Sequence, residues 1–372
     1  MIAISHHARI YLQPTAFVAS PFGRDEVVAR LAGGLLWFSA YEVIAVDGGV
    51  RTASMLVPIR EIANLLASLS EEQAGQARAT IARIVAPRSP MQLGERVLRF
   101  DQPQIMGILN MTPDSFSDGG ALFGDADRGA GAGLAMASAG AAIVDVGGES
   151  TRPGAQTVWE GDEILRAEPV VRRLAAAGTI VSIDTRKAAV MAAALAAGAA
   201  IVNDVSALSY DSQAAALLAG RSCPVVLMHH QGEPDTMQRQ PSYGDALIEV
   251  YDWLAARIAF AEAAGIARSR IIVDPGIGFG KTLRHNLQIL NGLAMFHGLG
   301  CPLLLGASRK RIIGALSNEA PVERRLGGSL ALALHGVQAG AQLLRVHDVP
   351  ETVQAVRIWR GLRDEALTPP RI

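Results

Sequence analysis

From about residue 91 to its end, the chain repeats one pattern, in which a short apolar run ends in polar or glycine residues and an Ala/Leu-rich stretch of helical length follows. The apolar runs occupy residues 105–109, 142–146, 180–183, 201–202, 225–228, 271–273, 302–305 and 342–346. Because these runs do not alternate apolar and polar residues, both faces of each strand should be covered, as in a parallel sheet. A doubly wound sheet would also fit, but eight units over roughly 280 residues favour an α/β fold of the (β/α)₈ type, a TIM barrel.

The segments between the runs are predicted to be helices. Residues 162–177 and 243–264 have the length of crossover helices. Gly178, Gly198 and Gly265 follow such segments, at the position where glycine commonly ends a helix.

Polar side chains gather where the predicted strands end. In a (β/α)₈ barrel the carboxyl ends of all strands face one mouth, so residues far apart in sequence converge there. The strand-end residues are Asn110, Asp145, Asp184, Asn203, Asp204, His229, His230, Asp274, Ser308, Arg309, Lys310, Arg345 and His347. Any single one could be an ordinary solvated loop residue, but their shared position predicts a functional site.

Residues 1–90 do not follow the repeat. Residues 30–49 look strand-like and residues 58–85 helical, which predicts a small N-terminal α/β extension. Residues 86–100 read as a linker followed by a short strand or hairpin that closes the lower end of the barrel. We therefore predict two domains, 1–90 and 91–372. The extension contains no motif with recognisable chemistry, so a structural or interface role is the default.

Composition excludes several classes of protein. A formal net charge of -1 provides no electrostatic footprint for a nucleic acid or an anionic membrane. The first residues lack the basic and apolar regions of a signal peptide, and the longest uncharged stretch, residues 188–203, is shorter than the ~20 residues that span a bilayer. Cys223 and Cys301 are expected to be reduced thiols. We expect a soluble cytoplasmic enzyme.

Two glycine-containing loops follow the first two strands. In residues 106–120, Phe116 is a large apolar side chain on a polar loop, as in a lid that closes over a ligand, and the amide oxygen of Asn110 suits Mg²⁺. A capped turn is the alternative interpretation of Asn110. In residues 145–155, Ser150 and Thr151 offer hydroxyls, and Arg152 offers a bidentate donor for phosphate or carboxylate.

Three strand ends supply acidic and amide groups, namely Asp184, Asn203 and Asp274. Carboxylates at the bottom of the mouth can accept the paired N–H groups of a flat heterocycle such as an aminopyrimidinone. A buried carboxylate requires a partner, so the alternative is an internal pair with Lys310 or Lys281. The segment GIGFGKT is no phosphate-binding P-loop, because Pro275 stands where that motif requires glycine.

The last two strands end in basic groups. Ser308, Arg309 and Lys310 follow strand seven, and Arg345 and His347 alternate at strand eight, so both should point the same way. Loops after these two strands form the usual phosphate site of this barrel, which predicts anion binding. A basic surface patch is the alternative.

Taken in order, these segments resemble the dihydropteroate synthase family. The matching segments are NMTPDSFSDGG, GGESTRPGA, SIDTRK, NDVS, LMHHQGEPDTMQ, DPGIGFGKT, GASRKRIIG and RVHDV, and the resemblance covers about residues 92–372. His230 stands where methionine is common in the family, and the N-terminal extension is a larger departure. The resemblance implies a sulfonamide-target transferase that joins (7,8-dihydropterin-6-yl)methyl diphosphate to 4-aminobenzoate, with Mg²⁺ as cofactor and a homodimer as the assembly.

The resemblance also implies a role for each matching position. The pterin pocket would contain Asp184, Asn203, Met228, Asp274, Phe279 and Lys310. The diphosphate would be bound by Asn110, Arg152, Arg345 and His347, with Asn110 as the metal ligand. The aminobenzoate would contact Phe116, Ser150, Thr151, Pro153 and Ser308. The residues expected to be catalytic are Asn110, Arg152, Lys310, Arg345 and His347.

The pterin ring can delocalise positive charge at its methylene, so we expect the diphosphate to leave ahead of attack and no strong general base to be needed. Catalysis would then stabilise the leaving charge, while the lid excludes water. Three other functions compete with this one: a pterin-binding methyltransferase barrel, a non-catalytic pterin-binding paralogue and an unspecified phosphate-binding barrel enzyme. A methyltransferase would share the acidic pocket but would have no need of the diphosphate-binding residues.

Overall fold

The computed structural model describes residues 4–112, 124–150, 157–232 and 236–369. Its main sheet has eight strands in the order β12-β11-β10-β9-β8-β7-β14-β13, and the paired neighbours in it run parallel. A parallel bridge between Val273 and Leu303 brings β12 beside the start of β13, so the sheet closes on itself. The strands are β7 Gln104–Asn110, β8 Ile143–Gly147, β9 Val181–Asp184, β10 Ile201–Asp204, β11 Val225–Met228, β12 Ile271–Asp274, β13 Leu304–Leu305 and β14 Leu343–Val346. The predicted (β/α)₈ barrel is confirmed.

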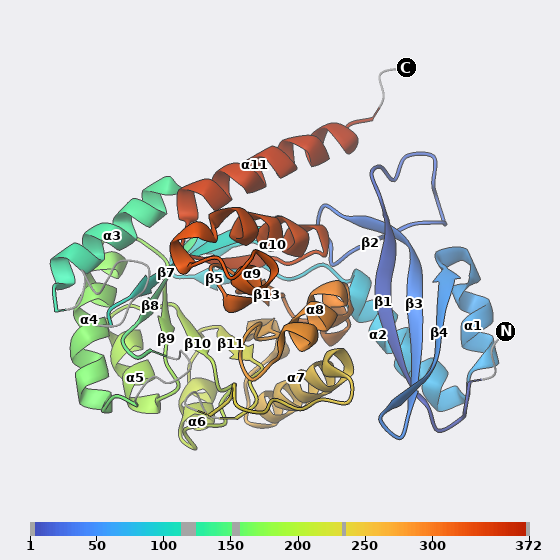
Figure 1. The fold of residues 1–372 in the computed structure, drawn as a ribbon, viewed down its shortest axis with the longest axis horizontal. Helices are drawn as coiled ribbons and strands as arrows, with labels where there is room; N and C mark the ends of the chain where they lie inside the picture. Colours follow the sequence, from blue (N-terminus) through green and yellow to red (C-terminus); the bar gives the residue numbers. More distant parts are fainter. Residues whose placement is uncertain (1–3, 113–123, 151–156, 233–235, 370–372) are drawn as a thin grey trace.

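Helices alternate with these strands and cover the outside of the barrel (Figure 1). They are α3 Ala126–Ala139, α4 Glu160–Ala176, α5 Ala188–Ala196, α6 Ala214–Ala219, α7 Ala246–Ala263, α8 Leu283–Asn291, α9 Arg311–Leu316, α10 Leu326–Gln338 and α11 Val349–Ala366, with 3₁₀ turns η2 Arg268–Arg270, η3 Leu293–Leu299 and η4 Val322–Arg324. Gly178, Gly198 and Gly265 follow α4, α5 and α7 with φ of +77°, +106° and +99°, as predicted for helix ends. Within the described ranges, none of the helices has the length and apolar character that crossing a membrane requires.

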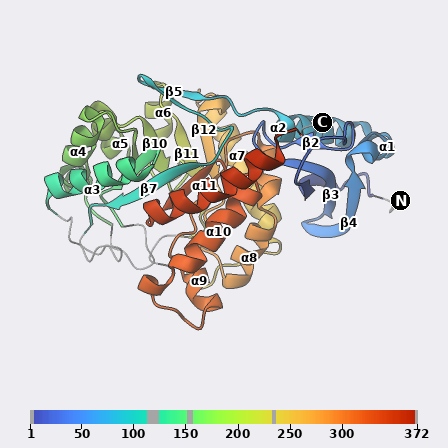
Figure 2. The same cartoon turned by 90° about the horizontal axis from the view of Figure 1, so that it is seen from above.

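A short hairpin closes the lower end of the barrel. It consists of β5 Met91–Leu93 and β6 Arg96–Leu98, and Figure 2 shows β5 at the end of the barrel opposite to α9. Its buried side chains and Phe100 form an apolar cluster with residues near the amino ends of the strands: Met106, Ile143, Ile180, Ile201, Val226, Ile272, Leu304 and Leu343. The hairpin expected from residues 86–100 is therefore confirmed.

The N-terminal extension forms a separate antiparallel sheet with helices. Its elements are β1 Arg9–Val18, β2 Ala29–Arg30, β3 Trp37–Asp47, β4 Val50–Pro58, η1 Ile59–Glu61, α1 Ile62–Ser68 and α2 Glu71–Val85. Strand β3 pairs with β1, β2 and β4. The sheet lies beside α7 and α8 (Figure 1), and the Tyr11 ring meets Tyr251 of α7 edge-on at 5.7 Å between centroids. The expected α/β content is confirmed, although β1 and β4 were not predicted.

Candidate active site

The carboxyl ends of the barrel strands bring the predicted polar residues to one mouth. Asn110, Asp184, Met228 and Asp274 are the last residues of β7, β9, β11 and β12, and Asn203 is next to the last in β10. Parallel pairing holds these ends side by side: Asn203 is in register with Asp184, and Met228 with Asp274. The convergence expected from the strand-end pattern is therefore present.

Arg345 forms the centre of the mouth. Its Nε donates to Asp145 Oδ2 at 2.6 Å and its Nη2 donates to Asp184 Oδ2 at 2.6 Å. Asn203 Nδ2 also donates to Asp145 Oδ2, at 3.0 Å. Asp145 is fully buried and was not among the predicted binding residues, although it lies in the run that precedes the GGESTRPG loop. Arg345, expected at the diphosphate, thus bridges two buried carboxylates.

These carboxylates are not fully satisfied. Asp145 Oδ1 and Asp184 Oδ1 are buried and have no hydrogen-bond partner among the residues that the structure describes. Burial raises the pKa of Asp184 from 3.8 to about 7, with Arg345 opposing the shift and Asp145 adding to it. Burial also disfavours the charged guanidinium of Arg345, but the two carboxylates outweigh it and raise the pKa of Arg345. The mouth therefore holds acceptor oxygens that a ligand can use.

Asp274 lies in a second polar group with Lys310. Its Oδ1 accepts a hydrogen bond from Gly276 N at 2.7 Å. Lys310 Nζ lies 4.4 Å from the centroid of the Phe279 ring and donates to Ile277 O. Burial raises the pKa of Asp274, opposed by Lys310, and burial lowers the pKa of Lys310 to about 8, opposed by Asp274. The expected carboxylate, cation and aromatic ring thus lie at one edge of the mouth.

Lys281, the second candidate counter-charge for a buried carboxylate, has a different setting. Its Nζ donates to His229 Nδ1 at 2.8 Å, to Gly276 O at 2.8 Å and to Phe279 O at 3.0 Å. Burial lowers its pKa well below the usual 10.5. Lys281 therefore holds the backbone of the loop between β12 and α8 rather than pairing directly with a strand-end carboxylate.

Ser308 and His347 follow the neighbouring strands β13 and β14 and lie together at the mouth. Ser308 Oγ lies 3.1 Å from His347 Nδ1 and accepts from His347 N at 3.2 Å. A side-chain carbon added to Gly147 would lie 3.4 Å from Asn110 Oδ1 and 3.8 Å from Asp184 Oδ2, so Asn110 and Asp184 flank this glycine. Arg309 instead pairs with Asp348. Ser308 and His347 therefore contact each other, and Asn110 lies near the Asp184 carboxylate.

Four predicted residues, Phe116, Thr151, Arg152 and Pro153, lie outside the described residues. Ser150 is described and half-buried, at the end of the segment that follows β8.

A buried cluster of two cations and two carboxylates, which was not predicted from the sequence, lies behind this segment. Lys187 Nζ donates to Glu149 Oε1 at 2.9 Å, to Glu163 Oε2 at 2.6 Å and to Val158 O at 2.7 Å. Arg186 Nε donates to Glu149 Oε2 at 3.1 Å. The cluster therefore ties Glu149 to Val158, whose N also donates to Glu149 Oε1 at 2.8 Å. The one available signal was the pair of cations in SIDTRK, whose partners the sequence does not identify.

Comparison with known proteins identifies the family. The model of the pterin binding enzyme family matches residues 106–347. The dihydropteroate synthase of Escherichia coli K12 is 48% identical over 262 residues, which is 70% of this chain and 92% of that protein. That of Neisseria meningitidis serogroup B is 46% identical over 280 residues, covering 74% of this chain and 98% of the relative.

Solved structures support the same family assignment. The Yersinia pestis dihydropteroate synthase in a sulfonamide drug complex is 43% identical, with a TM-score of 0.71, covering 74% of this chain and 100% of that one. The Xanthomonas albilineans enzyme in complex with 7,8-dihydropteroate is 41% identical, with a TM-score of 0.67, covering 74% and 99%. The chain therefore belongs to the dihydropteroate synthases of the pterin binding enzyme family.

Proposed function

We propose that the barrel mouth binds (7,8-dihydropterin-6-yl)methyl diphosphate and 4-aminobenzoate and joins them in folate biosynthesis. In this transfer the bond between the methylene carbon and the diphosphate oxygen breaks, the amine nitrogen bonds to that carbon, and the amine loses one proton. The observation that carries the placement is the convergence of the buried carboxylates Asp184 and Asp274 with the cations Arg345 and Lys310.

The carboxylates are suited to the pterin ring. An aminopyrimidinone edge presents a ring N–H beside an exocyclic NH₂. Asp184 Oδ1, which has no partner among the described residues, and the carboxylate of Asp274 can accept such donors. Asn203 adds an amide, while Met228 and Phe279 add apolar surface for the ring faces. A ligand that donates these hydrogen bonds removes the free-energy penalty of the unsatisfied buried acceptors. Much of the binding free energy should therefore come from the pterin ring.

The leaving diphosphate is assigned to the edge with Arg345 and His347, together with Asn110 and Arg152. Arg345 keeps its charge because its two carboxylates raise its pKa, so it can stabilise developing negative charge. In the described residues, no group of three or more His, Cys, Asp or Glu could hold a metal. The amide oxygen of Asn110, which flanks Gly147 together with Asp184, suits Mg²⁺, an ion commonly held by a few protein oxygens and by substrate phosphates. Bound there, Mg²⁺ would neutralise charge on the diphosphate.

The 4-aminobenzoate is assigned to Phe116, Ser150, Thr151, Pro153 and Ser308. Ser308 supports this assignment because its hydroxyl lies 3.1 Å from Nδ1 of His347, a residue assigned to the diphosphate. An aminobenzoate bound at Ser308 would therefore have its amine close to the bond that breaks. Departure of diphosphate ahead of attack requires no strong base, and the role of the side chains is to orient the two substrates and exclude water.

The test is a reaction of the purified protein with both substrates and Mg²⁺, in which diphosphate and dihydropteroate are measured together. Equal amounts of both products, lost when either 4-aminobenzoate or Mg²⁺ is omitted, are expected. Diphosphate release without any dihydropteroate in the complete mixture would contradict the transfer. Binding of pterin without any product would instead favour a non-catalytic paralogue.

The proposed assembly is a homodimer, and the proposed location is the cytoplasm. Exposed apolar side chains on α9, α10 and α11 support the dimer: Leu316, Leu326, Ile358 and Leu362. Two free cysteines, Cys223 and Cys301, suit a reducing compartment. Light scattering should give twice the 39.1 kDa mass of the chain, and a monomer mass would contradict the dimer.

A further inference from the structure

The N-terminal extension contacts the start of α7 through Arg51. This residue lies in β4, next to the turn that joins β3 to β4. Its guanidinium pairs with Asp245, donating from Nη2 to Oδ1 at 3.2 Å and from Nε to Oδ2. Asp245 is the N-cap of α7, and its Oδ1 also accepts from Ile248 N at 3.3 Å. Arg51 thus fixes the residue at which this barrel helix begins.

The chain just before Asp245 reaches the loop between β12 and α8, residues 275–281, here called the pterin loop. Tyr243 donates its hydroxyl to Gly280 O at 2.9 Å. A side-chain carbon added to Gly280 would lie 2.2 Å from Gln231 O, and Gln231 in turn exchanges two hydrogen bonds of 3.0 Å with Ser242. The segment that ends at Asp245 is therefore packed tightly against the pterin loop.

A second contact lies farther along the same helix. On β1, Arg9 donates to the two oxygens of Asp252 at 2.6 and 2.8 Å, and the Tyr11 hydroxyl is 2.8 Å from Asp252 Oδ2. Asp245 and Asp252 are two helical turns apart, so they lie on one face of α7, which is the face toward the extension. Two anchors at this spacing fix both the position and the rotation of the helix.

The neighbour of Asp252 leads to the pterin loop as well. The Trp253 ring meets His229 at 4.8 Å between centroids, and His229 Nδ1 accepts from Lys281 Nζ at 2.8 Å. Lys281 then donates to Gly276 O and Phe279 O, at 2.8 and 3.0 Å. Both contacts of the extension therefore continue, through different side chains, to the same loop.

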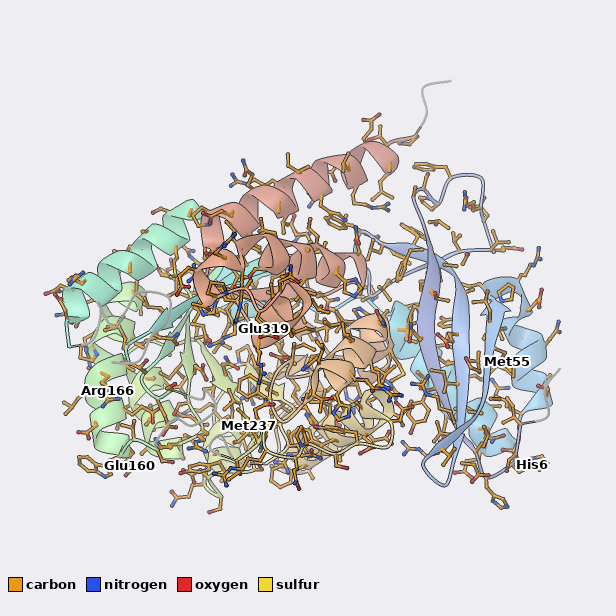
Figure 3. The ribbon with its side chains drawn as sticks, in the orientation of Figure 1. His6, Met55, Glu160, Arg166, Met237 and Glu319 are labelled. Carbon is orange, nitrogen blue, oxygen red and sulfur yellow. The ribbon has the colours of Figure 1, made fainter. Side chains whose placement is uncertain are left out.

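We propose that the N-terminal extension holds the pterin loop in its binding conformation through α7, with Arg51 and Arg9 as positioning residues. The effect falls on this loop because of where the extension lies. His6 and Met55 of the extension are at the opposite end of the molecule from Glu160 and Arg166 of α4, which follows the loop after β8 (Figure 3). The inference rests on the proposed assignment of Phe279, Asp274 and Lys310 to the pterin pocket.

The test compares Arg51→Ala, Arg9→Ala and the double variant with Arg60→Ala. Arg60 is a matched control, since it is an exposed arginine of the same extension that pairs with its own neighbour Glu61. Each partly exposed ion pair is worth up to ~1 kcal/mol, which corresponds to about a fivefold effect. The double variant should raise KM for the pterin diphosphate about tenfold while KM for 4-aminobenzoate stays within about twofold.

Two further measurements separate positioning from general destabilisation. In Arg51→Lys, the KM for the pterin diphosphate should lie between the wild-type value and that of Arg51→Ala. In the Arg51→Ala, Arg9→Ala double variant, hydrogen exchange should become faster in residues 229–232, 236–245 and 275–281. An unchanged pterin KM in the double variant, or an equal rise of both KM values, would overturn the proposal. The Asp274→Ala variant tests separately whether the pterin pocket is correctly assigned. If that variant binds pterin normally, the assignment of the pocket is wrong. If it loses pterin while the double variant does not, only the role of the extension fails.

Discussion

Replacing Asp184 by asparagine should stabilise the ligand-free enzyme at alkaline pH while weakening pterin binding. Asp184 is 5% exposed, its Oδ2 accepts from Arg345 at 2.6 Å, and its Oδ1 has no partner among the described residues. Burial raises its pKa from 3.8 to about 7 despite Arg345. The folded protein therefore resists the ionisation that the unfolded chain allows.

The raised pKa determines the sign and size of the effect. Below pH 3.8 the carboxyl is protonated in both the folded and the unfolded chain, so its ionisation does not change the free energy of unfolding. Between pH 3.8 and about 7 the unfolded chain has released the proton and the folded chain retains it, so the free energy of unfolding falls by ~1.4 kcal/mol per pH unit. Above pH 7 the accumulated loss is about 4 kcal/mol. Asparagine has the shape of the uncharged acid at every pH, and Arg345 keeps Asp145 as its partner.

The assay is urea unfolding of the ligand-free protein near pH 5 and near pH 8.5, with pterin binding measured by calorimetry. Asp127→Asn is the control, because the Asp127 side chain is 84% exposed. Asp184→Asn should be more stable than the wild type at the higher pH, and the gain should shrink by more than half at the lower pH. A variant that is less stable near pH 8.5, or a difference that does not change with pH, would refute the reasoning.

Three other substitutions test the site. Asp274→Ala should weaken pterin binding about 10- to 100-fold, the range for a hydrogen bond to a charged group, and calorimetry that finds unchanged affinity contradicts the assignment. Arg345→Ala should slow diphosphate release in a single turnover and cost about 3–5 kcal/mol of stability, because two buried carboxylates lose their cation; an unchanged rate rules out its role at the anion. Gly276→Ala should lower the melting temperature and pterin affinity, since φ is +66° and the added carbon would lie 1.9 Å from His229 O. A wild-type melting curve would argue against this strain.

The strand ends of the barrel could be predicted because two independent regularities coincide there. Uninterrupted apolar runs locate buried parallel strands, and the barrel geometry brings their carboxyl ends to one mouth. The partners of Arg345 could not be predicted in this way. Asp145, Asp184 and Asp274 all stand at or near strand ends, and choosing among them requires the distances between strands far apart in sequence. Asp145 was expected at the mouth with the other strand-end residues, but no ligand or partner was assigned to it.

Strands β1 and β4 of the N-terminal extension were less predictable because many of their side chains are exposed, unlike those of β3. In β1, RIYLQPTAFV, polar and apolar residues alternate imperfectly and Pro14 interrupts the run. In β4, VRTASMLVP, most side chains are exposed, including Leu56 at 65%. Both strands are stabilised by pairing with β3, a long-range interaction that no local pattern records.

The ion clusters around Lys187 and Arg345 differ in where their unsatisfied oxygens lie. Around Lys187, both oxygens of Glu149 accept hydrogen bonds from protein side chains, while the one unsatisfied oxygen among the described residues of this cluster, Glu163 Oε1, belongs to helix α4. Around Arg345, by contrast, Asp145 and Asp184 each keep one buried oxygen that no described residue satisfies. A folded chain gains no stability from an unsatisfied buried acceptor, which costs about 1–3 kcal/mol. The Arg345 cluster lies at the carboxyl ends of the strands, where the strand-end pattern placed the site, so its open oxygens are the ones that a ligand in the barrel mouth can satisfy.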